Sequence, residues 1–324
     1  MKIFLVVLAL ALCGCASRQP LQNYRLPVAQ VELDETPFFP QQRYQCGPAA
    51  LATVLVADGV TVTPDELALY VYLPERRGSL QVEMVAATRR YGRVPYVLRP
   101  RFDDLLAELA SGKPVLVMLN LSVKLLPQWH YAVVIGYDVH SDSMLLRSGT
   151  TARLRMTRVR FQGAWSRAEQ WAMVVVPPDE MPATVQSSDW LRSASAFEEL
   201  GQTELVLQAY RAATRRWPEL HLAWLALANA LYGLHDLPGA ESALRRALEL
   251  EPSAAVHNNL AHVLNQRGCL AEAAAHIELA ESMEDARLFP DGLKKTRLAI
   301  EANPGPQSSS CFPQYPDQYV KPEK

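Results

Sequence analysis

Residues 41–51 read Gln-Gln-Arg-Tyr-Gln-Cys-Gly-Pro-Ala-Ala-Leu. Gly47 and Pro48 open a helix in which apolar residues recur at helical spacing, so Cys46 stands at its first turn. The positive end of a helix dipole and a nearby imidazolium lower the pKa of a thiol by several units. We therefore expect Cys46 to be a nucleophilic thiolate at neutral pH.

Two glutamines stand just before this cysteine. The side-chain amide of Gln41 or Gln42 can donate a hydrogen bond to the oxyanion that forms when a carbonyl is attacked. The backbone N–H of Cys46 would be the second donor. One such donor stabilises the transition state by about 3 kcal/mol, so both glutamines are candidates for the oxyanion hole.

A candidate base for the nucleophile is His130, which leads the apolar run 131–137. The β-branched and aromatic residues of that run predict a strand. A histidine at the mouth of a strand can face the N-terminus of a helix packed on the same sheet. Cys46 and His130 are therefore a candidate nucleophile and general base for acyl transfer through a thioester.

Mixed helix and strand patterns fill residues 38–178. Helix signals come first and strand signals follow, which indicates an α+β domain with a largely antiparallel sheet. Helices are expected to open at residues 47 and 64 and to cover 79–90 and 103–110. Strands are expected at 94–98, 115–121, 131–137, 144–147 and 171–176.

The N-terminal residues predict the compartment. Residues 3–12 form an apolar run too short to span a bilayer, as in a signal peptide. The run ends in Leu12-Cys13-Gly14-Cys15, which resembles the lipobox of bacterial lipoproteins and implies a signal peptide of residues 1–15 with lipid attached to Cys15. The absence of aspartate after Cys15 implies the outer membrane, facing the periplasm. Residues 16–37 are polar without periodicity and predict a tether.

The cysteines outside the signal peptide are too few and too far apart in the sequence to form a recognisable pattern. Of the five in the chain, Cys46, Cys269 and Cys311 lie outside the signal peptide, widely spaced and odd in number. They show neither a disulfide framework nor metal-ligand spacing. Cys269 and Cys311 can pair, but we expect both to be incidental. No metal or other cofactor is expected.

A second domain follows a linker at 179–189, which is rich in Pro, Ser and acidic residues. Beyond it, similar residues recur with a period of 34, as at Trp190 and Trp224 or Pro218 and Pro252, which is the period of tetratricopeptide repeats. Repeats with a capping helix are expected over 190–302 and a disordered tail over 303–324. The first helices, with Asn229 and Asn258, are expected to line a concave face that binds a protein partner.

Charge argues against one class of partner. Lys and Arg number 32 against 34 Asp and Glu, a formal net charge of -2. The chain therefore lacks the basic excess that binds a phosphate backbone, and nucleic acid is not an expected partner.

The motif Cys46-Gly47-Pro48-Ala49-Ala50-Leu51 after a glutamine, then His130-Tyr131, four apolar residues and Gly136-Tyr137-Asp138, resembles the double-glycine peptidases. These papain-like enzymes cut leader peptides from bacteriocins. The resemblance covers about residues 38–176 and implies a papain-like cysteine peptidase domain, with Cys46 as nucleophile, His130 as general base and Gln41 as oxyanion donor. The lipobox and the repeats resemble a free-standing lipoprotein branch of that family, with no transporter attached.

Two departures from the family pattern concern the site. The family glutamine usually stands six residues before the cysteine, where this chain has Pro40, and the family aspartate falls on Leu146. A hairpin turning near 139–142 instead brings Ser148 or Thr150 opposite His130, and we expect Ser148 to hold the imidazole. Asp138 stands at the far end of the same strand and is expected to form a turn.

The expected function is a lipid-anchored cysteine peptidase that cleaves a peptide or small protein, with the repeats recruiting the substrate or a partner. The alternative is a catalytically silent adaptor that binds peptides and assembles a complex. A third hypothesis, cell-wall peptide hydrolysis, ranks lower because those enzymes typically carry Asp-Cys-Ser-Gly at the nucleophile.

Overall fold

The computed structural model describes residues 19–40, 45–303 and 311. The chain divides into two compact units. The first runs to Pro177 and takes in Pro182–Val185, and the second begins its continuous course at Gln186. The division falls within the linker expected at 179–189 or next to it.

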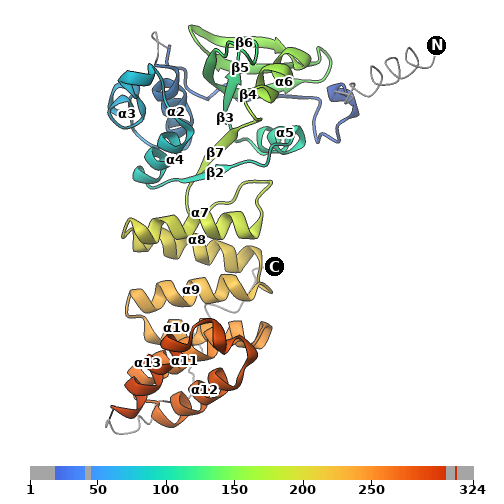
Figure 1. The fold of residues 1–324 in the computed structure, drawn as a ribbon. Coiled ribbons are helices and arrows are strands. Elements are labelled where there is room, and N and C mark those ends of the chain that lie inside the picture. The colour runs from blue at the N-terminus through green and yellow to red at the C-terminus, as the bar shows by residue number, and fades with distance from the viewer. Residues whose placement is uncertain (1–18, 41–44, 304–310, 312–324) are drawn as a thin grey trace, which may run out of the picture. The chain divides into compact units, whose positions relative to one another are not determined.

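A seven-stranded antiparallel sheet is the centre of the first unit (Figure 1). Its order is β2-β7-β3-β4-β5-β6, and β1 pairs with the last three residues of β4. The strands are β1 Gln30–Glu32, β2 Val94–Val97, β3 Val115–Asn120, β4 Trp129–Asp138, β5 Ser143–Ser148, β6 Thr151–Thr157 and β7 Ala172–Val176. The antiparallel sheet of the predicted α+β domain is thus confirmed.

Helices cover both faces of this sheet (Figure 1). On one face, α2 Cys46–Ala57, α3 Pro64–Val71 and α4 Gln81–Arg90 share a hydrophobic core with Tyr131 and Val133 of β4. On the other, α5 Phe102–Ala110 and α6 Arg158–Ser166 meet through tilted aromatic contacts of Phe102 with Phe161 and Trp165. α2 is buried from Gly47 to Leu55, so it is the central helix of the first face.

The segment before α2 packs against the domain, although residues 16–37 were expected to form a tether. Leu21 in the short helix η1 Leu21–Asn23 is fully buried, and its N–H donates to Asp142 Oδ1 at 3.0 Å. β1 then reaches Gly136 of β4, where a Cβ would lie 3.0 Å from Glu32 Cα. The polar composition of this segment hid its few buried side chains, and any tether ends before Leu21.

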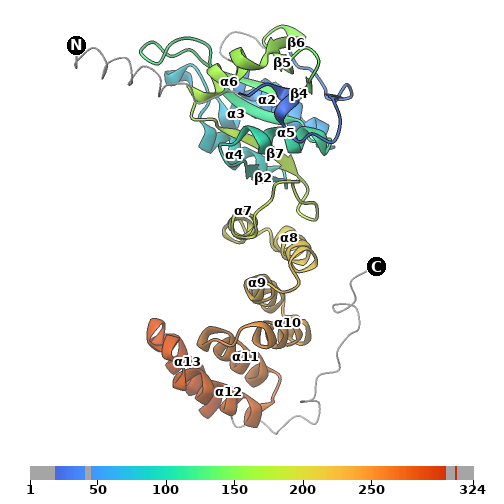
Figure 2. The same cartoon turned by 90° about the vertical axis from the view of Figure 1, so that its right-hand side faces the viewer.

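The second unit is all-α, and its helices stack in chain order (Figure 2). α9 starts 34 residues after α7 (187 to 221), α10 starts 34 after α8 (203 to 237), and α11 starts 33 after α9 (221 to 254). The predicted period therefore appears as recurring helix pairs. The helices are α7 Ser187–Glu199, α8 Thr203–Arg216, α9 His221–Gly233, α10 Leu237–Leu250, α11 Ala254–Gln266, α12 Leu270–Ser282, η3 Glu284–Leu288 and α13 Pro290–Glu301.

Cys269 and Cys311 form a disulfide, so the expectation that both are incidental was wrong. Their sequence separation of 42 residues hid the pairing, because α12, η3 and α13 fold between them. Within the described residues, Cys46 is the free cysteine. In that same part of the chain, no helix has the length and apolar character needed to cross a membrane.

Candidate active site

Cys46 is the first residue of α2, as the sequence predicts. Its thiol is half-buried and lies beside the backbone N–H groups of Cys46 itself and Gly47, which belong to the open first turn of the helix and lower its pKa. A third backbone N–H, that of Tyr131 in β4, also donates to the thiol. Cys46 therefore lies at the contact between the start of α2 and β4.

Gly47 allows this close packing. A Cβ at position 47 would lie 2.6 Å from Ser79 Cβ and 3.6 Å from Met84 Sδ. The segment before α4 thus fills the space that any larger side chain would need. The Tyr131 hydroxyl donates to Ser79 O at 3.3 Å, which ties the same segment to β4.

His130 is the second residue of β4, where it pairs with Leu119 of β3. Its Nε2 shares a hydrogen bond of 2.8 Å with Ser148 Oγ at the end of β5. Val133 pairs with Arg147, so Ser148 lies diagonally across from His130 on the neighbouring strand. The expected proximity of these two side chains is present.

The other two candidates for the third position do not contact the imidazole. Thr150 is exposed in the turn between β5 and β6. Asp138 ends β4, where its carboxylate accepts hydrogen bonds from His140 N–H, from the N–H and hydroxyl of Ser141, and from Arg155. The Ser141 and Arg155 donors lower the pKa of Asp138 to about 2. Asp138 is therefore a turn-forming residue, as expected.

Cys46 and His130 lie beside the same point of β4. Tyr131, whose N–H donates to the Cys46 thiol, directly follows His130 in the chain. Among the hydrogen bonds of the described residues, that of the imidazole goes to Ser148, and none joins it to the thiol. Hydrogen bonds of catalytic pairs often form fully only when substrate is bound.

Burial determines the charge state of Cys46 and His130. It raises the pKa of the Cys46 thiol more than the backbone N–H donors of Tyr131, Gly47 and Cys46 lower it. Burial also lowers the pKa of His130. Both shifts favour a thiol and a neutral imidazole in the resting pair at neutral pH and oppose the expected Cys46 thiolate, which stays a prediction. The helix N-terminus acts as predicted, but loss of water around the thiol outweighs it.

Three residues of the predicted site lie outside the described residues: Gln41 and Gln42, the candidate oxyanion donors, and Cys15, the candidate lipidation site. Their roles stay predictions.

One residue near the site was not predicted from the sequence. Asn120, fully buried at the end of β3, pairs with Trp129 directly before His130. Its Oδ1 accepts hydrogen bonds from the N–H groups of Ser122 and Gln128 at 3.0 and 3.1 Å, so it closes the loop that leads to His130. A polar residue that ends an apolar strand was the signal available in the sequence.

Three of the other histidines form packing contacts in the second unit. His257 and His276 share a hydrogen bond of 2.9 Å between their Nδ1 atoms, and His262 Nε2 lies 2.8 Å from the Tyr232 hydroxyl. Across residues 19–40, 45–303 and 311, no group of three or more His, Cys, Asp or Glu side chains could hold a metal ion.

Part of the chain is similar to a known protein family. Residues 30–173 match the model of the Peptidase_C39 like family. No curated protein matches the chain. A protein from Bacillus anthracis described as a C39-like peptidase is 18% identical over 47% of this chain and 98% of its own, with a TM-score of 0.39.

Two further structures are similar to the chain. A double glycine motif protease of an AMS/PCAT transporter, solved with its leader peptide, is 17% identical over 47% of this chain and 96% of its own (TM-score 0.35). The peptidase domain of Streptococcus ComA, a bifunctional ABC transporter involved in quorum sensing, is 20% identical over 44% and 99% (TM-score 0.36). The family match runs from β1 into β7 and includes Cys46, His130 and Ser148, so the similarity to this family lies in the first unit.

Proposed function

We propose that the chain is a cysteine peptidase, held on a membrane by lipid at Cys15, that cleaves a peptide or small protein in the periplasm. The observation that carries the proposal is the position of Cys46: a free thiol at the first turn of a buried helix, hydrogen-bonded by the N–H of the residue after His130. The match of residues 30–173 to a peptidase family supports the same chemistry.

The neutral resting pair defines how the reaction would start. When Nε2–H of His130 donates to Ser148 Oγ, Nδ1 keeps its lone pair and can take the thiol proton as sulfur attacks the scissile carbonyl carbon. The C–N bond then breaks, and the imidazolium returns the proton to the leaving amine. Water, activated by the same imidazole, hydrolyses the thioester and frees Cys46.

The oxyanion of each tetrahedral intermediate needs hydrogen-bond donors to stabilise it. The backbone N–H of Cys46 is one, at the positive end of α2. We assign the second to the side-chain amide of Gln41, with Gln42 as the alternative.

Two features support an oxidising compartment and a membrane anchor. The Cys269–Cys311 disulfide is typical of proteins outside the cytosol. The lipobox ending at Cys15 favours cleavage before Cys15 and acylation of its thiol, and the residues that follow it favour the outer membrane.

The repeats are proposed to recruit the substrate or a protein partner. Asn259 of α11 donates to Asn229 Oδ1 of α9 at 3.0 Å, and Asn258 donates to Asn259. These amides link the first helices of neighbouring pairs, where stacks of this kind bind extended chains. Removing residues 189–324 should then raise KM for the natural substrate and spare a short peptide.

A silent peptide-binding adaptor is the second candidate. The raised pKa of the buried Cys46 thiol favours it, because a protonated thiol is a poor nucleophile.

One experiment separates the two functions. Periplasmic peptides are compared by mass spectrometry between cells with the wild-type chain, Cys46→Ala and His130→Ala, and the purified proteins are treated with a peptide-based thiol-reactive inhibitor. A peptidase predicts uncleaved precursor in both variants and covalent labelling of Cys46 that weakens in His130→Ala. Identical peptide profiles with no labelling of Cys46 would establish the adaptor. Thr150→Ala is a matched control, since Thr150 is exposed and outside the pair.

A further inference from the structure

The connection between β3 and β4 forms, together with the first residue of β4, an exposed apolar finger, residues 121–129. Leu125 and Leu126 at its tip are 88% and 73% exposed, and Trp129 at its base is 52% exposed. Leu121 and Val123 are exposed as well. Contiguous apolar side chains on a protein surface mark a surface that contacts a partner or a membrane.

The finger has a defined backbone. Leu121 N–H donates to Gln128 O at 2.9 Å, and a β-bridge joins Val123 to Leu126. Asn120 holds the base through its side chain, and its backbone O accepts the Arg167 guanidinium at 2.9 Å. The apolar tip is thus fixed in an exposed position, with little ordering needed on binding.

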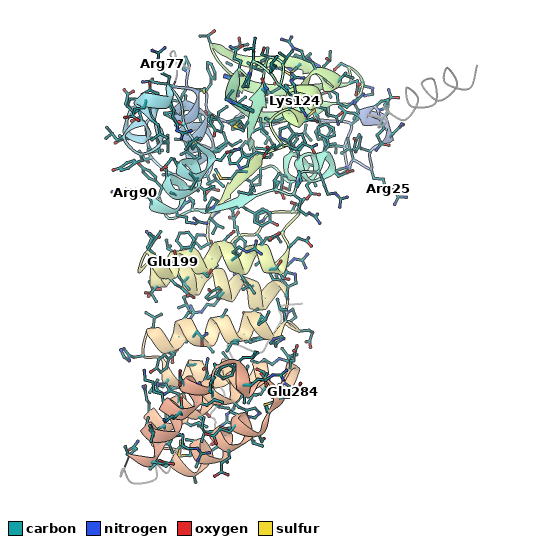
Figure 3. All side chains as sticks on the ribbon, viewed as in Figure 1. Arg25, Arg77, Arg90, Lys124, Glu199 and Glu284 are labelled. Carbon is teal, nitrogen blue, oxygen red and sulfur yellow. A yellow bond between two sulfur atoms is a disulfide. The ribbon has the colours of Figure 1, made fainter. Side chains whose placement is uncertain are left out.

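Charge favours an anionic partner. Lys124 is the one charged residue of the finger (Figure 3). The surrounding domain is basic as well, with 16 Lys and Arg against 11 Asp and Glu over residues 38–178. Leu, Trp and Lys together are the residues found where proteins enter the interface of an anionic bilayer.

The length of chain before the domain brings such a bilayer within reach. Leu21 is buried and bonded to Asp142, so only residues 16–20 separate it from Cys15. Fully extended, that segment spans about 20 Å. Acylation of Cys15 would therefore hold the first unit against the membrane surface.

We propose that the apolar finger inserts into the interface of an anionic lipid bilayer as a second membrane contact, an inference that rests on the lipid anchor of the proposed function. Leu21 contacts the turn after the end of β4, while the finger lies at the start of β4. These points lie about 30 Å apart along a strand of 10 residues. Since this exceeds the reach of the tether, β4 would lie along the membrane rather than upright on it.

The test is tryptophan quenching by brominated lipids in vesicles of phosphatidylethanolamine and phosphatidylglycerol, with the full acylated chain. Wild type is compared with Trp129→Phe and with Leu125→Ser/Leu126→Ser. The matched control is Leu69→Ser, which changes an 81% exposed leucine of α3. Acylation of Cys15 is measured separately by mass spectrometry, and peptidase activity is measured on a short peptide without vesicles. Failure of the lipid anchor or of catalysis can then be distinguished from failure of the finger to insert.

The proposal expects quenching in wild type that is lost in Trp129→Phe and reduced at least about threefold in the double variant, with Leu69→Ser unchanged. Quenching that is equal in wild type and Trp129→Phe would overturn it, as would absence of the chain from floated vesicles. A higher KM in the double variant with unchanged quenching would also overturn it and assign the finger to peptide binding.

Discussion

His130 Nε2 lies 2.8 Å from Ser148 Oγ, and a hydroxyl thus occupies the place beside the imidazole where a carboxylate would supply charge. A hydroxyl can fix the tautomer and the ring orientation, but it cannot stabilise an imidazolium by charge. Burial lowers the pKa of His130, and no carboxylate offsets that effect. As the proposed base, His130 is therefore oriented but weak.

Ser148→Ala is expected to lower kcat by about three- to tenfold, the equivalent of one neutral hydrogen bond of about 1 kcal/mol. Ser148→Asp should raise the pKa of His130, because a carboxylate favours the charged imidazole, and should move the acid limb of the pH–rate profile upward. Rate profiles of both variants on one peptide check this. An unchanged kcat in Ser148→Ala would show that Ser148 does not position the base.

Asp138→Asn is expected to leave kcat and KM unchanged, because Asp138 ends β4 eight residues beyond His130. Stability should change instead. The folded-state pKa of Asp138 is about 2, below its ordinary 3.8, so its stabilisation is present above pH 4 and is lost as pH falls towards 2. The variant should lose about 1 kcal/mol at neutral pH, allowing for solvent screening, and the difference should vanish near pH 2. Loss of activity with stability intact would instead make Asp138 part of the site.

The alkylation rate of Cys46 is expected to rise with a midpoint above the value of about 8.5 of a free thiol, because burial raises its pKa. At neutral pH the thiol is protonated and alkylation should be slow. His130→Ala should shift the midpoint little, since the imidazole is uncharged there. A midpoint well below 8.5 that moves up in His130→Ala would restore the thiolate–imidazolium pair.

The elements that carry Cys46 and His130 were predictable because they are long apolar runs. α2 is buried from residue 47 to 55, and β4 is buried over most of its length. β6 and α6 were missed: β6 is an edge strand with mostly exposed side chains, and α6 carries polar residues at buried positions. An edge strand shows little of the alternation that identifies a half-buried one.

The charge state of the site could not be predicted from the sequence, for a related reason. The helix-opening position of Cys46 could be predicted from Gly47 and Pro48. The burial that opposes a thiolate depends on tertiary packing, in which Met84, Leu116 and Tyr131 belong to the core beside the thiol. Sequence patterns indicate where a thiol stands on its helix, but they do not indicate how much water reaches it.

Gly47→Ala is expected to reduce activity and to lower the free energy of unfolding by about 1–3 kcal/mol, because its Cβ would overlap Ser79 at the start of α2. Urea denaturation and the labelling rate of Cys46 check both effects. Adding Ser79→Gly should recover part of each loss. Gly233→Ala is the control, since nothing lies within 4 Å of its Cβ position. Equal stability in Gly47→Ala and wild type would contradict the packing argument.

Cys311→Ser is expected to destabilise the second unit, because the disulfide closes a loop of 42 residues around α12, η3 and α13. The chain-entropy account puts the effect at about 4 kcal/mol. Cys311 is the better position to change, since Cys269 is 2% exposed and a polar atom there would add a cost of its own. Thermal unfolding followed by far-UV circular dichroism should show a lower midpoint for the helical unit. Reducing the wild type should reproduce this shift, and reducing the variant should change nothing. If wild type unfolds alike with and without reductant, the disulfide does not stabilise the terminal helices, and its effect must lie in fixing the chain near Cys311.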